Sequence, residues 1–163
     1  MRYSELVRRG KEDLADKTVA HGGVARAATG FEAFDIPPAA FVDRSAFIDA
    51  ARTGLPGEVV KQAIDVFGHR ELMVRLVGTT SGNLHRVYRR KALGPAQSEV
   101  LLDTLRVFFH ATAAFGNLDR ASEWLDTALP ALGGQRPVDL CDTFEGRRLV
   151  QDAIQRIEHG EFP

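Results

Sequence analysis

The residue types that most often bind metals or carry out catalysis are present, but their spacing supports neither chemistry. The chain has five histidines and one cysteine, and none of the spacings CxxC, HxxxH or HExxH that set two ligands beside one metal ion occurs. The stretch AHGGV at residues 20–24 lacks a GxSxG nucleophile elbow that it could serve. There is no phosphate-binding GxxxxGK[ST] loop. We therefore predict no catalytic residue, no metal and no cofactor, and expect that the protein is not an enzyme.

A second group of side chains has chemistry suited to nucleic acid. The stretch RELMVRLVGTTSGNLHRVYRR, residues 70–90, has the apolar pattern of two short helices around Gly78, which can adopt a left-handed turn. The second helix would direct polar side chains outward, with arginine suited to guanine or phosphate and asparagine to adenine. We predict a helix-turn-helix whose DNA contacts are Ser81, Asn83, His85, Arg86, Arg89 and Arg90. The alternative is an ordinary pair of antiparallel helices with a solvated basic face.

The distribution of charge supports two separate tasks. The net charge is −1, but residues 56–91 hold seven basic and three acidic side chains, whereas residues 92–163 hold six basic and eleven acidic ones. A basic segment beside an acidic one is expected when one part binds nucleic acid and the other does not. Chance clustering remains the simpler alternative.

The composition describes a globular chain with one core or two small ones. The 163 residues are 44% hydrophobic, and no apolar run approaches the roughly 18 residues of a membrane helix. The charged start lacks the apolar centre of a secretory signal, and a single cysteine excludes an internal disulfide. We expect a cytoplasmic protein with no membrane partner.

Helical periodicity recurs along the chain, and alternating β-branched runs are absent, so the predicted fold is all-α. Expected helices cover residues 45–52, 58–67, 70–78, 79–94, 95–115 and 118–129, with one turn from Pro137 and a last helix from near Asp142. Ser45 and Asp142 are the expected N-caps of two of them. Glu99, Asp103, Arg106 and His110 form the polar stripe of the 95–115 helix. Cys141 should pack in the core. In the least readable part, residues 1–44, YSELVRRGKEDLA predicts a helix from Ser4. The stretch HGGVARAATGFEAFDIPPAAF shows no clear period, and it either forms an arm packed on the rest or is partly disordered.

The order of landmarks in the second half resembles the Xre/MbcA/ParS antitoxin family. LGPAQSEVLLDTLRVFFHATAAFGN is similar to that family's long helix with its Phe-Gly stop. ASEWLDTALPALGGQRPVDLCDT is similar to its W-L-x6-L-x-G-x-x-P-x-x-L-x-x-T signature, and EGRRLVQDAIQRIEHGEF to its closing helix and tail. The resemblance is strong over about half of the chain and weaker over the helix-turn-helix part, and it does not cover residues 1–55.

This resemblance implies a division of labour along the chain. Residues 1–55 would be an N-terminal extension, residues 56–92 an Xre-like helix-turn-helix region that binds promoter DNA, and residues 93–163 a helical toxin-binding region. The partner would be a RES-domain toxin that degrades NAD, and the antitoxin would be a homodimer that represses its own operon. The Gly-Gly and Arg-Pro pairs near residue 135 would form a rigid joint that aims the last helix at the toxin.

In this family the C-terminal end of the antitoxin blocks the toxin's active site. A cleft for a dinucleotide combines apolar walls with cationic groups, and an aromatic, acidic tail suits both. The residues implied in toxin binding are Arg136, Arg147, Arg148, Arg156, His159, Gly160, Glu161, Phe162 and Pro163. Simpler interpretations are a frayed terminus and solvated, exposed arginines. The competing functions are a helix-turn-helix regulator whose C-terminal region only dimerises, and a small enzyme.

Overall fold

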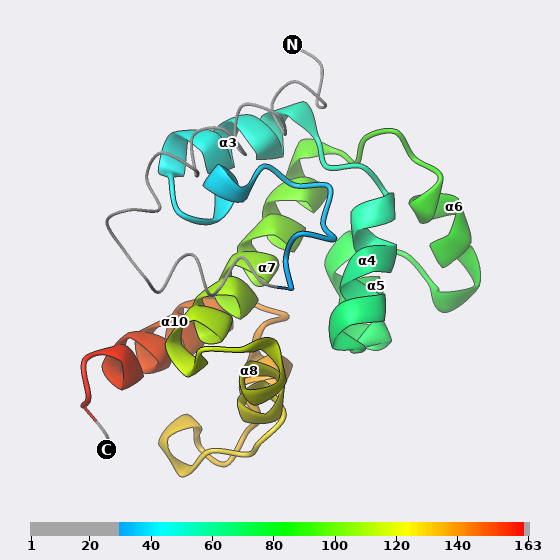
Figure 1. Cartoon of the computed structure of the whole chain (residues 1–163). Coiled ribbons are helices and arrows are strands. Elements are labelled where there is room, and N and C mark those ends of the chain that lie inside the picture. The colour runs from blue at the N-terminus through cyan, green and yellow to red at the C-terminus, as the bar shows by residue number, and fades with distance from the viewer. Residues whose placement is uncertain (1–29, 162–163) are drawn as a thin grey trace.

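The computed structural model describes residues 30–161, and the regular elements of this part of the chain are helices joined by turns and loops (Figure 1). It contains no strand, only one isolated bridge between Leu129 and Gln135. The prediction of an all-α fold is confirmed. The elements in order are η1 Pro38–Phe41, α3 Arg44–Thr53, α4 Glu58–Phe67, α5 Arg70–Val77, η2 Ser81–Asn83, α6 Leu84–Tyr88, α7 Pro95–Phe115, α8 Leu118–Leu125, η3 Pro130–Leu132, α9 Pro137–Leu140 and α10 Phe144–Glu158.

Helix α7 is the central element, and α3, α5, α8 and α10 all pack against it (Figure 1). Its bounds are those expected from the sequence, because Pro95 occupies the first turn and Gly116 ends the helix with a left-handed φ of 81°. Since neighbours surround α7, its polar stripe is not a solvent face. Asp103 and His110 are half-buried, and His110 Nε2 lies 3.2 Å from the Phe41 carbonyl oxygen. Two of the four residues of the polar stripe therefore pack against neighbouring elements.

Part of the N-terminal segment that showed no period supplies the aromatic centre of the core. The rings of Phe31 and Phe41 lie 5.3 Å apart, and Phe41 stacks on Phe109 of α7 at 4.9 Å with an interplanar angle of 10°. Phe67 of α4 meets Phe108 at 4.7 Å. Residues 31–41 thus join α4 to α7 and pack on the rest of the chain, whereas the helix expected from Ser4 lies outside the described residues.

Two helix caps differ from the predicted ones by one or two residues. Asp43, not Ser45, caps α3, because its backbone is extended and its carboxylate accepts from the Ala46 N–H at 2.8 Å. Thr143, not Asp142, caps α10 by accepting from the Gly146 N–H at 3.0 Å. Both regions hold more than one residue of cap-forming type, so the sequence leaves the choice between neighbours open.

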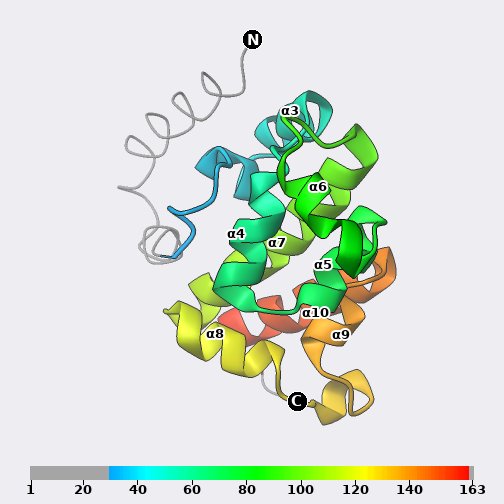
Figure 2. The ribbon, with the colours of Figure 1, turned by 90° about the vertical axis from the view of Figure 1, so that its right-hand side faces the viewer.

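Helices α4, α5 and α6 form a compact group beside α7 (Figure 2). Val59, Val60, Ala63 and Phe67 of α4 are buried in the core. Gly57, just before α4, donates its N–H to the Arg90 carbonyl oxygen at 2.9 Å. A Cβ at this position would lie 1.8 Å from the Val87 carbonyl oxygen, so the end of α6 approaches as closely as only glycine permits.

Two features are absent from the described residues. None of their helices is long and apolar enough to cross a membrane. They also contain no group of three or more histidine, cysteine or acidic side chains placed to hold a metal ion.

Candidate DNA-facing and partner-binding surfaces

The predicted helix-turn-helix stretch forms two helices joined at Gly78, whose φ of 66° is left-handed. Met73 and Val77 before the turn and Leu84 and Val87 after it are buried, as the apolar pattern requires. The second helix is shorter than expected from residues 79–94: Ser81–Asn83 is a 3-10 turn and only Leu84–Tyr88 is α-helical. No side chain caps the start of the 3-10 turn, so the N-cap that would favour a longer helix is missing.

All six residues predicted to contact DNA are exposed on this surface: Ser81, Asn83, His85, Arg86, Arg89 and Arg90. Their surroundings separate them into two kinds. Arg90 donates to the Gln97 side chain at 3.2 Å. The side chains of Arg86 and Arg89, in contrast, make no hydrogen bond or ion pair with any described residue, so these two cations are available to a phosphate or a base edge.

The turn is fixed from two sides. Arg70 at the start of α5 donates to the Ser81 carbonyl oxygen at 3.1 Å. Gln97 in the first turn of α7 donates to the Val77 carbonyl oxygen at 2.6 Å. These contacts hold the exposed polar residues in one orientation relative to α7, which is what a recognition surface needs.

The glycine pair of the predicted joint lies in a loop between η3 and α9. Leu129 pairs with Gln135 across Gly133 and Gly134, and both glycines have positive φ. Arg136 then donates two hydrogen bonds to Asp139, at 2.7 and 2.8 Å. The hydrogen bond from Arg136 lowers the pKa of the Asp139 carboxyl, and the same bond raises the pKa of Arg136. The Arg-Pro pair thus begins the one-turn helix α9, as predicted.

Arg147, expected to be an exposed cation, is instead buried with 6% of its surface exposed. Its Nε lies 2.6 Å from Asp103 Oδ2 on α7, and its other end donates to the Cys141 carbonyl oxygen at 3.0 Å. Arg106 binds the second Asp103 oxygen at 2.6 Å. The exposure expected from the sequence is wrong because the first turn of α10 packs on α7. Cys141 is fully buried, as predicted, and burial raises the pKa of its thiol to about 12.

The other residues implied in toxin binding lie at the surface. Arg136, Arg148, Arg156, His159, Gly160 and Glu161 are all exposed. Gly160 ends α10 with a φ of 71°, as its type predicted. Phe162 and Pro163 lie outside the described residues.

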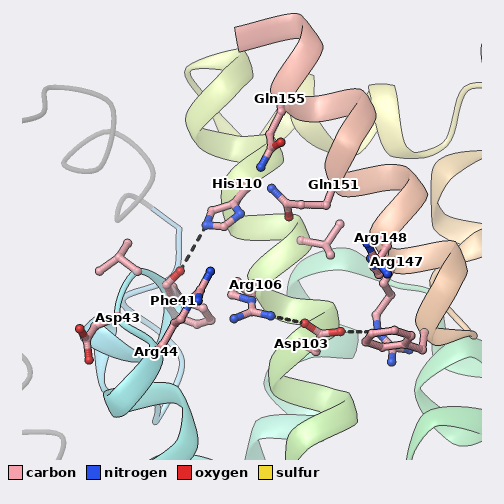
Figure 3. A pocket seen from close by; sticks show the side chains of 13 residues that line it. Phe41, Asp43, Arg44, Asp103, Arg106, His110, Arg147, Arg148, Gln151 and Gln155 are labelled. Atoms are coloured by element: carbon pink, nitrogen blue, oxygen red, sulfur yellow. Dashed lines mark hydrogen bonds and ion pairs between the residues drawn. The ribbon is translucent and has the colours of Figure 1, made fainter. Parts of the chain in front are cut away.

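A groove that the sequence did not reveal runs between the start of α3, the middle of α7 and α10 (Figure 3). We call it the α3–α10 groove, and its volume is about 620 Å³. Its lining combines cations, amides and apolar side chains: Phe41, Val42, Asp43, Arg44, Asp103, Arg106, Val107, His110, Phe144, Arg147, Arg148, Gln151 and Gln155. The polar stripe of α7 was the only sequence signal for it. The contribution of residues 41–44, about 60 positions away, depends on tertiary packing.

Comparison with known proteins identifies the class to which this chain belongs. Residues 110–160 match the family model described as the antitoxin Xre/MbcA/ParS C-terminal toxin-binding domain.

Three relatives agree with this match. "Antitoxin Xre" of Photorhabdus laumondii is 31% identical over 115 residues, which cover 66% of this chain and 74% of that protein. "Antitoxin Xre" of Yersinia enterocolitica is 35% identical over 94 residues, covering 55% and 62%. "Prs ADP-ribosylating antitoxin" of Sphingobium sp. is 45% identical over 51 residues, 31% of this chain and 32% of that protein.

The chain belongs to the Xre/MbcA/ParS antitoxin family. It is therefore an antitoxin of a toxin–antitoxin system, with a toxin-binding domain at its C-terminal end. The family consists of toxin-binding proteins and not of enzymes, in agreement with the prediction made from the absence of a catalytic constellation.

Proposed function

We propose that this antitoxin neutralises a RES-domain toxin that degrades NAD, by placing its C-terminal end in the toxin's active site. The observation that carries the proposal is the position of the matched toxin-binding domain, which extends to residue 160, where α10 ends in exposed residues. The elements that would enter the cleft are Arg156 and His159 on the last turn of α10, and the tail Gly160, Glu161, Phe162 and Pro163.

The chemistry of the tail fits a dinucleotide cleft. Such a cleft has apolar walls for the rings and cations for the phosphates, and the tail offers an aromatic ring and a carboxylate in consecutive residues. The name of the Sphingobium relative, "Prs ADP-ribosylating antitoxin", refers to ADP-ribosylation. A toxin that transfers ADP-ribose also needs a cleft for a dinucleotide donor, so either kind of toxin would accept the same blocking element.

Deletion of residues 160–163 tests the blocking role. We expect the truncated antitoxin to co-purify with the toxin encoded by the neighbouring gene but to leave its NAD consumption uninhibited and the cells arrested. The matched control replaces the exposed Glu58 of α4 by Gln, which removes one negative charge elsewhere and should leave neutralisation intact. Full neutralisation by the truncated chain would show that the tail is not the blocking element.

We further propose that residues 56–92 bind the promoter of the antitoxin's own operon, with the chain acting as a homodimer. The two unpaired cations, Arg86 and Arg89, support this proposal, together with the net positive charge of the segment. Arg86→Ala and Arg89→Ala should each weaken promoter binding in a gel shift and reduce its salt slope by about 1.

Lys61→Ala is the control for the promoter experiment. Lys61 lies on α4, outside the six predicted DNA contacts, and it is placed 3.6 Å from Glu58 and 3.7 Å from Asp65. Because these two carboxylates already offset its charge, its loss should leave the salt slope unchanged. If all three variants shift promoter DNA like the wild type, α6 is not the recognition element. Sedimentation of the antitoxin alone checks whether it is a dimer.

A further inference from the structure

The lining of the α3–α10 groove holds four arginines and two aspartates, so its net charge is positive. Its acidic groups are already engaged: Asp103 accepts from Arg106 and Arg147, and Asp43 accepts from the Ala46 N–H as the cap of α3. The side chain of Arg44 makes no hydrogen bond or ion pair with any described residue. Arg148 has a weak partner: its Nη1 lies 3.7 Å from Glu145 Oε1, which is too long for a hydrogen bond, and both side chains are mostly exposed. Two guanidinium groups therefore face the groove without a strong anionic partner.

The groove also offers groups that suit an extended chain. Gln151 and Gln155 lie one turn apart on α10 and line the same wall (Figure 3), and neither side chain makes a hydrogen bond within the described residues. Primary amides of this kind donate to carbonyl groups and accept from N–H groups of a peptide backbone. Apolar side chains mark the two sides, Val42 at 48% and Phe144 at 61% exposure. Large exposed apolar side chains beside a polar groove are typical of protein-binding sites.

Contacts of two arginines hold α3, α7 and α10 together around the groove. Arg147 fixes α10 to α7 through Asp103, and Arg106 lies over the Phe47 ring of α3 at 4.3 Å. The three elements that form the groove are thus connected by charged contacts, so its shape is set before a partner arrives. A preformed groove loses less entropy on binding than one that must be assembled.

From this charge complementarity we infer that the α3–α10 groove binds an acidic peptide segment of the toxin, in which carboxylates alternate with apolar side chains. The inference rests on the proposed toxin partnership but not on the blocking role of the tail. Carboxylates would pair with Arg44 and Arg148, apolar side chains would pack on Val42 and Phe144, and the backbone would meet Gln151 and Gln155. The groove would hold the toxin while the tail inhibits it.

Charge reversal at the two available arginines tests the inference. The double variant Arg44→Glu/Arg148→Glu, in the full-length chain, should bind the toxin of the neighbouring gene at least tenfold more weakly in titration calorimetry, with a shallower salt dependence. Arg52→Glu is the matched control, since Arg52 is an exposed arginine in the last turn of α3 that does not line the groove. It should bind like the wild type. Circular dichroism melting checks that each variant is folded.

The two proposals fail in different ways. At saturating concentration the groove variant should still inhibit the toxin, whereas the tail deletion should bind without inhibiting. A toxin affinity of the double variant within twofold of the wild type overturns the groove inference and leaves the tail proposal standing. An unchanged affinity together with an altered sedimentation coefficient of the antitoxin alone would assign the groove to a second copy of this chain. A wild-type antitoxin that binds no toxin overturns both.

Photocrosslinking identifies the occupant directly. With p-benzoylphenylalanine in place of Val42, the complex should yield a crosslinked toxin peptide that contains aspartate or glutamate. A crosslinked peptide without acidic residues, or a crosslink only to the antitoxin itself, contradicts the inference. The same substitution at Arg52 provides the background level of crosslinking.

Discussion

Asp103 accepts two hydrogen bonds of 2.6 Å and through them joins α7 to α10. Its position on α7 brings Arg106 of the same helix and Arg147 of α10 to one carboxylate. Because the Arg147 side chain is only 7% exposed and that of Asp103 17%, water competes little for these bonds. The pair Asp103–Arg147 thus fixes the position of α10 on α7, and with it the position of the toxin-binding end.

Arg147→Ala should lower the free energy of unfolding by about 3 kcal/mol. The substitution removes the hydrogen-bond donor of the buried Cys141 carbonyl oxygen and leaves the Asp103 carboxylate paired only with Arg106. The measurement is urea denaturation followed by circular dichroism. Arg148→Ala, one position further along α10 but exposed, should change the same quantity by less than about 1 kcal/mol. Equal effects of the two substitutions would show that burial of Arg147 does not matter for stability.

Cys141, the only cysteine, should be unreactive in the folded chain. Burial raises the pKa of its thiol from 9.0 to about 12, so at pH 8 the folded protein carries about a thousandfold fewer thiolates than the unfolded one. Alkylation by iodoacetamide, followed by mass spectrometry, should be slow in buffer and fast in urea. Rapid alkylation in buffer would contradict the buried position.

The same shift predicts the sign of a pH effect. As pH rises above about 9, the unfolded chain loses the thiol proton first, so stability should fall between there and about 12. Cys141→Ala should remove this component of the decline, which a series of melting curves at increasing pH would reveal.

At the scale of elements, the sequence predicted helices well where local signals bound them. Pro95 and Gly116 delimit α7, and Gly68 and Gly78 end α4 and α5, because proline and glycine act on their own backbone. The sequence was less accurate for the length of α6 and for the N-caps of α3 and α10, where neighbouring residues have similar propensities to start a helix. Residues 31–41 have no period because their backbone is largely irregular, although their rings are central to the core.

Some features of the candidate sites could be predicted from helical spacing, and others depend on tertiary packing. Exposure of the six helix-turn-helix residues followed from helical spacing, whereas the burial of Arg147 and the α3–α10 groove did not. Both depend on α10 lying across α7 near residues 41–44, an arrangement between segments far apart in the sequence. Periodicity reports which face of a helix is apolar, but not which polar side chain meets a buried partner of opposite charge.

The joint between α9 and α10 is sensitive to one added methyl group. A Cβ on Gly146 would lie 1.8 Å from the Leu140 carbonyl oxygen, so Gly146→Ala must separate the two helices. We expect a loss of about 2 kcal/mol in unfolding free energy and weaker toxin binding, since α10 changes direction. Gly82→Ala is the control, because nothing lies within 4 Å of its added Cβ. A Gly146→Ala melting temperature equal to that of the control would contradict this contact.

At the scale of the whole molecule, one core runs from the aromatic cluster through α7 to α10. The helix-turn-helix group is joined to the C-terminal part through α7 and also through His69 Nε2, which lies 3.1 Å from Asp126 Oδ1 after α8. The proposed DNA-binding and toxin-binding regions therefore share a core, and we expect them to unfold together.

The only tryptophan makes this expectation measurable. Trp124 packs at 5.3 Å from Phe115 in the C-terminal part, so its fluorescence reports on that part, while far-ultraviolet circular dichroism reports on all helices. The two urea transitions should coincide within error. A fluorescence midpoint that differs from the circular dichroism midpoint would show that the parts unfold separately.

The contact at Gly57 also constrains how such a sequence can diverge. Among the fifteen glycines of the chain, Gly82 can be exchanged without backbone strain or collision, whereas at Gly57 any side chain strikes the carbonyl group that ends α6. If α6 is the recognition element that we propose, its exposed residues, and with them the operator that they select, can change while residue 57 stays glycine.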